Sequence, residues 1–105
     1  MECIIVFVTC KDADQAEKIS SKLLEEHLAA CVNIIDHVKS FFHWEGKIDN
    51  AEEVMMVIKT RRDLFDAVKH AVKELHSYKV PEIVAVPIVE GDDDYLNWVR
   101  RETRI

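Results

Sequence analysis

His76 and Glu82 are the side chains in this sequence best suited to bind a metal ion. They lie six residues apart, on either side of a predicted turn. A neutral imidazole and a carboxylate are both accepted as ligands by copper and zinc. We therefore predict a divalent metal site, for copper or zinc, at His76 and Glu82, and no cofactor that the protein requires. The alternative is that His76 only ends a helix and Glu82 is an exposed residue at the start of a strand.

The other residues with reactive side chains indicate no enzyme. His37 and His43 are six residues apart, and at about 3.3 Å per strand residue they are too far apart to share one ion. The sequence lacks the histidine, serine and glycine motifs of metalloproteases, hydrolases and nucleotide-binding proteins. Its two glycines cannot form a glycine-rich phosphate loop. We expect a protein that binds rather than catalyses.

Composition limits the class of protein further. The chain has 105 residues, enough for a single domain over residues 1–105, and a net charge of −6 without a large basic cluster, which argues against nucleic acid. No apolar run reaches 18 residues and no basic region precedes the first apolar stretch, so neither a membrane span nor a signal peptide is predicted. Three cysteines without a paired motif favour a reducing compartment. We expect a cytoplasmic protein.

Hydrophobic periodicity predicts alternating strands and helices. Strands are expected at residues 4–8, 31–44 and 54–58, with a bulge near Asp36 and His37 and a turn at 45–47. A fourth strand is expected from Ile83, ended by Gly91, with Pro87 at an edge or a bulge. Helices are expected from Asp12 to near Ala29, over residues 61–75, and as a short tail helix that begins at residues 92–94. Residues 12 and 15, and again 60 and 63, resemble capping boxes.

This order of elements predicts an α+β fold, a ferredoxin-like βαββαβ sandwich with an extra C-terminal helix. Right-handed crossovers place both main helices on one face of the sheet. Several strands are nevertheless apolar at consecutive positions, so Ile5, Phe7 and Val57 cannot all face the helices. Burying such side chains contributes roughly 1.5–3 kcal/mol each. We expect copies of the chain to cover the second face.

Five segments of the chain resemble the CutA family of divalent-cation tolerance proteins. They are LAACVNI at residues 28–34, WEGKI at 44–48, IKT at 58–60, LHSYKVPEI at 75–83 and YLNW at 95–98. This resemblance implies a homotrimer with an architecture similar to the PII signalling proteins. It also implies a cytoplasmic role in tolerance of, or response to, divalent metals such as copper, and no established reaction.

The resemblance also implies a second candidate site. Trp44, Lys59 and Tyr78 match family positions, and a cleft between subunits lined by them could hold a small anionic ligand. Their alternative role is packing at the interface. Metal binding, small-ligand sensing as in PII proteins, and a structural trimer that binds other proteins therefore remain three hypotheses.

The chain differs from the usual family pattern beside the candidate metal site. Ser77 stands where proline is common after the histidine, and Lys79 stands where an acidic residue is common. Some family members carry a copper-ligating cysteine near the end of the first strand. The aligned residue here is Val8, and Cys10 follows two residues later.

Overall fold

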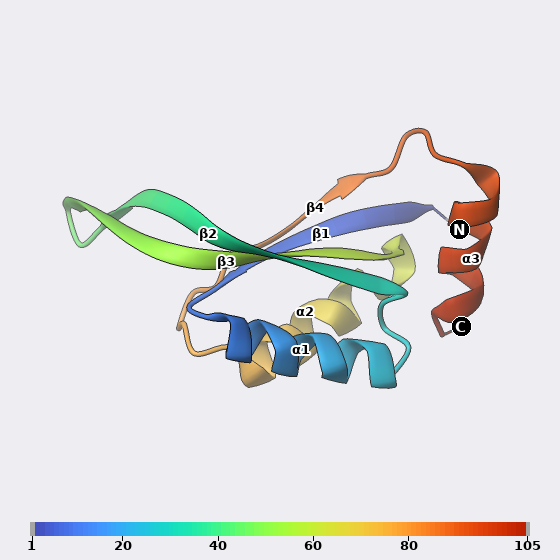
Figure 1. Ribbon diagram of the computed structural model, residues 1–105, viewed down its shortest axis with the longest axis horizontal. Helices are drawn as coiled ribbons and strands as arrows, with labels where there is room; N and C mark the ends of the chain where they lie inside the picture. The colour runs from blue at the N-terminus through green and yellow to red at the C-terminus, as the bar shows by residue number, and fades with distance from the viewer. Residues whose placement is uncertain (1, 105) are drawn as a thin grey trace.

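The computed structural model describes residues 2–104 of the chain. Four strands and three α-helices follow one another with short connections (Figure 1). In chain order they are β1 (Cys3–Cys10), α1 (Ala13–Glu25), β2 (Cys31–Trp44), β3 (Lys47–Arg61), the 3₁₀ turn η1 (Arg62–Leu64), α2 (Phe65–Leu75), β4 (Ile83–Pro87) and α3 (Asp93–Glu102). In this described part of the chain, no helix has the length and apolar character needed to cross a membrane. The predicted mixed α+β class is confirmed.

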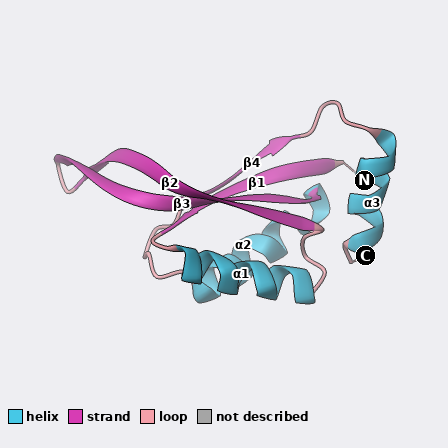
Figure 2. Cartoon of the chain, viewed as in Figure 1, coloured by secondary structure: helices cyan, strands magenta, loops and turns pink. Residues whose placement is uncertain are grey.

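The four strands form one antiparallel sheet in the order β2-β3-β1-β4. Helices α1 and α2 lie on the same face of this sheet, and α3 lies at one end of it (Figure 2). The core between helices and sheet contains fully buried side chains from every layer, among them Val6, Ile19, Leu23, Ile58 and Val72. One face of the sheet is therefore covered by the chain's own helices.

Helix α1 ends earlier than predicted. Asp12 caps its start as expected, because its carboxylate accepts the Gln15 N–H at 2.9 Å. The helix stops at Glu25 rather than near Ala29, since His27 takes a left-handed φ of 56°. Leu28 and Ala29 remain buried in the connection that follows. Because these two residues are apolar, the sequence pattern wrongly predicted a further helical turn.

The start of the second helix was also predicted wrongly. Strand β3 continues to Arg61, and α2 begins only at Phe65 after η1. Thr60 does not cap a helix, because its hydroxyl donates to the Leu28 carbonyl at 2.6 Å. Asp63 instead accepts two hydrogen bonds from the Arg61 guanidinium, at 2.9 and 2.7 Å. The polar spacing of a capping box was present, but a tertiary contact used the Thr60 hydroxyl and a local ion pair with Arg61 used the Asp63 carboxylate.

Strands β2 and β3 extend beyond the other strands as a long hairpin arm, which we define as residues 36–53 (Figure 1). The predicted bulge is confirmed by a register shift between Ile35 and Val38, where His37 has a φ of 62°. The predicted turn is confirmed too. Glu45 and Gly46 both have positive φ, the pattern of a two-residue type I′ turn. β3 begins at Lys47, earlier than predicted, because it forms half of this arm.

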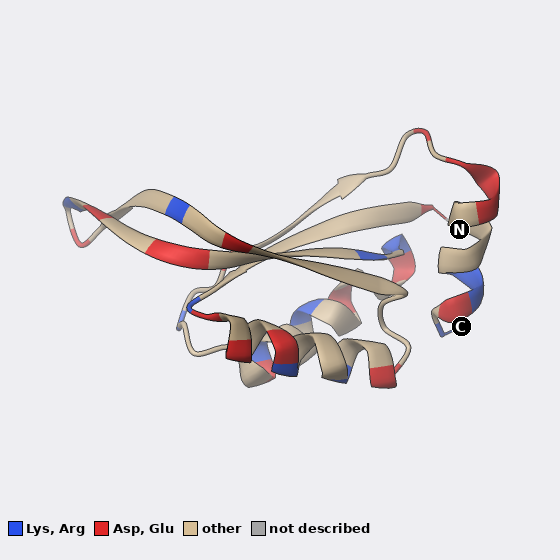
Figure 3. Cartoon of the chain, in the orientation of Figure 1, with Lys and Arg blue, Asp and Glu red and all other residues tan. Residues whose placement is uncertain are grey.

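The second face of the sheet, which we name the open face, has no helix packed along it (Figure 2). The register places alternate residues of each strand there. Ile35, Val84 and Val86 on this face are 44–50% exposed. The centre of the sheet carries little charge, whereas acidic and basic residues gather on the helices, the arm and the loop before α3 (Figure 3). The central part of the open face consists of Cys31, Asn33, Ile35, Met55, Val57, Lys59, Ile5, Phe7, Val84 and Val86. The same alternation places Cys3, Thr9 and Arg61 on this face nearer its ends.

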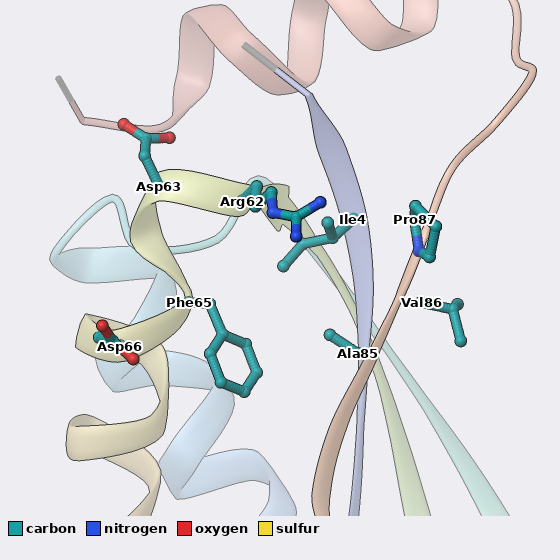
Figure 4. Close-up of a pocket in the computed structure, with 8 residues that line it drawn as sticks. All are labelled: Ile4, Arg62, Asp63, Phe65, Asp66, Ala85, Val86 and Pro87. Carbon is teal, nitrogen blue, oxygen red and sulfur yellow. The ribbon is translucent and has the colours of Figure 1, made fainter.

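Strand β4 is an edge of the sheet, as the position of Pro87 predicted. Ile88 donates its N–H to the Cys3 carbonyl. In an antiparallel pair every second residue is hydrogen-bonded to the neighbouring strand, so Val86 and Val84 face β1 as Ile88 does. The backbone groups of Ala85 and Pro87 consequently point away from β1. A groove of about 500 Å³ runs between this edge and the start of α2 (Figure 4). Its walls are Ile4, Arg62, Asp63, Phe65, Asp66, Ala85, Val86 and Pro87.

Candidate functional site

His76 follows the last residue of α2 and connects this end of the helix to β1. Its Nε2 lies 2.7 Å from the Thr9 carbonyl oxygen, and its Nδ1 lies 3.0 Å from the Tyr78 backbone nitrogen. A carbonyl can only accept and a backbone N–H can only donate, so the neutral tautomer with hydrogen on Nε2 satisfies both contacts. The imidazole therefore holds the loop after α2 against the end of β1.

Glu82 lies at the far end of the same loop, just before β4, and its side chain is exposed. Across residues 2–104, no three side chains from His, Cys, Asp and Glu are grouped closely enough to hold a metal ion. The structure thus brings no third ligand to His76 and Glu82 within one chain. Metal binding by this pair stays a prediction.

Tyr78 connects the same loop to β3 through a buried carboxylate. Its hydroxyl donates to Glu53 Oε2 at 2.8 Å, and Glu53 is only 7% exposed. The Tyr78 ring also packs against the His76 ring, with centroids 4.8 Å apart. Burial, followed by the hydrogen bond and charge of Glu53, raises the pKa of Tyr78 from 10.0 to about 12. The phenol therefore remains a donor at neutral pH.

Replacing Tyr78 with phenylalanine should destabilise the protein, because it leaves the buried Glu53 carboxylate without this donor. Hydrogen bonds to charged groups typically contribute about 1.5–3 kcal/mol, and we expect a loss of free energy of unfolding in that range. Urea unfolding of Tyr78→Phe, Glu53→Gln and the double variant measures the coupling. If the Tyr78 substitution has the same effect with glutamine at position 53, the charge of Glu53 adds nothing to this hydrogen bond.

The same raised pKa predicts how stability depends on pH. An acid whose pKa is higher in the folded state contributes stability that is present below its unfolded pKa and lost as pH rises through its folded pKa. For Tyr78 this loss falls between about pH 10 and pH 12. The Tyr78→Phe variant should lack this part of the alkaline destabilisation.

Cys10 and Val8 lie where a sulfur ligand would be expected from the family pattern, and neither is accessible. Both side chains are 0% exposed on the core side of β1. Burial first, then the charges of Glu53 and Asp12, raises the pKa of the Cys10 thiol from 9.0 to about 11. A thiol binds metals as its thiolate. Cys10 therefore behaves as a buried apolar residue, as does Cys3.

Trp44, Lys59 and Tyr78 do not form a cleft within one chain. Trp44 pairs with Lys47 at the tip of the arm, and Lys59 lies twelve residues further along β3, roughly 40 Å away for an extended strand. The longest dimension of the molecule is 44 Å. Any ligand site that uses these side chains together therefore needs more than one copy of the chain.

Two functional contacts were missed in the sequence. Glu53 was overlooked because it precedes the apolar run of β3 and reads as part of a charged arm. A glutamate next to an apolar strand and a tyrosine elsewhere in the chain do not predict a hydrogen bond between them. Only the fold shows that Tyr78 and Glu53 meet. The Thr9 carbonyl that binds His76 had no sequence signal, because it belongs to the backbone.

Comparison with known proteins places the chain in a family. The family profile described as "CutA1 divalent ion tolerance protein" matches residues 4–102. The divalent-cation tolerance protein CutA of Pyrococcus horikoshii is 44% identical over 101 residues, which are 96% of this chain and 98% of that protein. The chloroplastic CutA of Arabidopsis thaliana is 40% identical over 96% of this chain, but the chain spans only 56% of that protein's length.

Solved structures agree with the sequence comparison. The divalent cation tolerance protein of Thermus thermophilus superimposes with a TM-score of 0.95 at 41% identity, covering 97% of this chain and 99% of that one. CutA1 of Oryza sativa gives a TM-score of 0.96 at 39% identity, covering 99% and 95%. With residues 4–102 matched by the family profile, this chain belongs to the CutA1 divalent ion tolerance protein family.

Proposed function

We propose that the protein acts in the tolerance of divalent metal ions, as a homotrimer that binds copper or zinc. Membership of the CutA1 family is the observation that supports this role. We further infer that it binds rather than catalyses, since the sequence contains no recognisable catalytic motif.

Metal binding through His76 would be coupled to movement of the loop that follows it. The Nδ1 lone pair accepts the Tyr78 N–H and the Nε2 hydrogen is directed at Thr9, so a metal must replace one of these partners. Replacing the Tyr78 contact frees the loop that carries Glu82, the second predicted ligand. It would also disturb the bond between Tyr78 and Glu53. Such coupling would let metal binding alter the surface around the loop.

Calorimetric titration of Cu²⁺ and Zn²⁺ tests this proposal. We expect wild type to bind a divalent ion, and His76→Ala and Glu82→Gln to bind it at least tenfold more weakly. His70→Ala is the matched control, because His70 lies exposed on α2, with its Nε2 3.8 Å from a Glu74 carboxylate oxygen. Wild-type binding that survives unchanged in His76→Ala would rule out this metal site.

Two features of the fold support self-association. The open face is largely apolar, and contiguous apolar surface of this kind normally marks an interface. In addition, β2 and β4 are the opposite edges of one sheet. Each is hydrogen-bonded to one neighbouring strand, β2 to β3 and β4 to β1, so each has an unpaired outer edge. When β2 of one copy joins β4 of the next, the contact is head-to-tail, and such a contact closes into a ring where the rotation between neighbouring copies permits it and otherwise continues as an open filament. We propose a ring of three copies that encloses the open face, in a ferredoxin-like, PII-like arrangement.

The groove beside β4 supports the same arrangement (Figure 4). An incoming strand would find free backbone groups at Ala85 and Pro87 and an apolar wall formed by Phe65. Light scattering on wild type should give a mass of three times 12.2 kDa at micromolar concentration. A mass of one chain would contradict the trimer. The metal titration would still test binding at His76 and Glu82.

A second candidate function is the sensing of a small anionic ligand at a cleft between copies. The separation of Trp44 from Lys59 favours a site shared by neighbouring chains over one within a chain. A structural trimer that binds other proteins is the remaining alternative. Thermal shift with a nucleotide panel distinguishes them, because a ligand that binds only the folded state raises the melting temperature.

We keep the cytoplasm as the proposed location. The names of relatives differ on this point: the Arabidopsis protein is chloroplastic, and the related structure from Archaeoglobus fulgidus is described as periplasmic. Fractionation of the native host, with an antibody against this chain, tests the location directly.

A further inference from the structure

The hairpin arm begins where β3 loses its neighbour β1. Strand β1 pairs with β3 only as far as Cys10, which lies opposite Val54. On the other side of Val54, strand β2 carries two residues, Asp36 and His37, so the bulge coincides with the root of the arm. Of the described strands, only β2 and β3 continue beyond this point (Figure 1). The bulge is therefore the position at which the arm can bend relative to the sheet.

His37 has a backbone conformation in the bulge that glycine adopts more readily. Its φ is 62°, in the left-handed region that a Cβ makes unfavourable. The imidazole makes a contact that can offset this cost, because its Nδ1 lies 2.9 Å from a carboxylate oxygen of Glu52. Glu52 belongs to the arm and pairs with Lys39, beyond the bulge. The contact thus joins the root of the arm to the ribbon that extends from it.

The strength of this contact depends on the charge of the imidazole. A carboxylate only accepts, so Nδ1 donates whether the ring is neutral or protonated, but only the protonated ring adds attraction between opposite charges. The two side chains are 84% and 63% exposed, so water screens this attraction without removing it. The charged residues next to the bulge along β2, across it on β3 and just after β1 are Asp36, Lys39, Glu52, Glu53, Lys11 and Asp12.

Acidic groups nearest to the ring favour its protonated form. The hydrogen bond to Glu52, followed by the charges of Glu52 and Asp36, raises the pKa of His37 above its ordinary value of 6.5. A histidine whose pKa is higher in the folded state contributes stability that is complete below its unfolded pKa and is lost as pH rises through its folded pKa. For His37 this loss therefore falls above pH 6.5.

From the position of this ion pair across the bulge, we propose that His37 and Glu52 form a pH-dependent clamp on the root of the arm. The clamp holds the arm in mildly acidic solution and loosens as the imidazole loses its charge. Its release changes where the arm presents Phe41 and Trp44, which are 73% and 53% exposed. The clamp acts within one chain and requires neither the metal site nor the trimer.

Hydrogen exchange of peptides from residues 38–53, read by mass spectrometry, tests the clamp. Wild type is compared with Glu52→Gln and His37→Asn at pH 5.5 and again at pH 8, because comparison at one pH removes the intrinsic pH dependence of exchange. Asparagine tolerates a positive φ, so the bulge is kept in His37→Asn. At pH 5.5 we expect the arm to exchange roughly two- to fivefold faster in both variants, as is typical for loss of an exposed ion pair. At pH 8 the difference should nearly vanish.

His43→Asn is the matched control, because His43 lies on the same arm but opposite Ile48 rather than a carboxylate. This variant should exchange like wild type at both pH values. Glu52→Gln leaves the backbone of the bulge untouched, so its result decides the question even where His37→Asn distorts the arm. Exchange in Glu52→Gln that equals wild type at pH 5.5, or that is faster by the same factor at both pH values, would overturn the proposal.

Discussion

Replacing Val57 with glutamate should leave the protein as a single folded chain of 12.2 kDa at concentrations where wild type is assembled. Val57 lies on the open face between Asn33 and Phe7. A carboxylate there stays solvated in an isolated chain, but assembly would bury it with no cation or hydrogen-bond donor placed to compensate its charge. The penalty for a buried, unpaired charge is at least several kcal/mol, which exceeds what one interface residue normally contributes.

Light scattering measures the mass, and circular dichroism shows whether the single chain keeps its helices and sheet. Ser21→Glu is the control, because Ser21 is exposed on the outer side of α1 and gains the same charge. Should the glutamate prevent folding, Val57→Thr preserves the branched shape and adds only a hydroxyl. A Val57→Glu protein that is folded and still trimeric would show that the open face is not the interface.

Truncating Ile58 to alanine should cost about 2–5 kcal/mol of the free energy of unfolding, as is typical for large-to-small changes in a core. Ile58 is 0% exposed and lies between Val6 and Val32 beneath the two main helices. Neighbouring strands fix its position on both sides, so the cavity that is left cannot collapse easily. The effect should be larger than for any surface substitution.

Chemical unfolding must be compared at one protein concentration, since the stability of an oligomer depends on it. Val89→Ala is the control, because Val89 is 86% exposed in the loop before α3. We expect Val89→Ala to change the free energy of unfolding by less than about 0.5 kcal/mol. Equal losses for Ile58→Ala and Val89→Ala would mean that the buried sheet face does not determine stability.

Strong periodicity made most elements of this fold predictable. The apolar runs of β1 and β4 and the amphipathic spacing of α2 each specify one kind of element, and the turn at Glu45 and Gly46 follows from local backbone preference. Element ends were less predictable. Leu28 and Thr60 satisfy each other across 32 residues of sequence, and no local pattern contains that hydrogen bond.

The candidate site was less predictable than the fold. His76 was singled out by its residue type and Tyr78 by the family resemblance, but their contacts depend on where β1 and β3 lie relative to the end of α2. Both ring nitrogens of His76 bond to backbone groups, the Thr9 carbonyl and the Tyr78 N–H. Nearly every residue carries such groups, so the sequence does not indicate which ones the ring meets.

The two free edges of the sheet have a consequence for the newly made protein. Before the proposed trimer forms, each chain exposes the unpaired edges of its sheet and an apolar face, a combination that favours aggregation. Pro87 reduces this hazard on the β4 edge, because it offers a carbonyl but no N–H to an incoming strand. Dilute expression and rapid assembly should therefore determine how much of the protein remains in solution, more than the stability of the finished fold does.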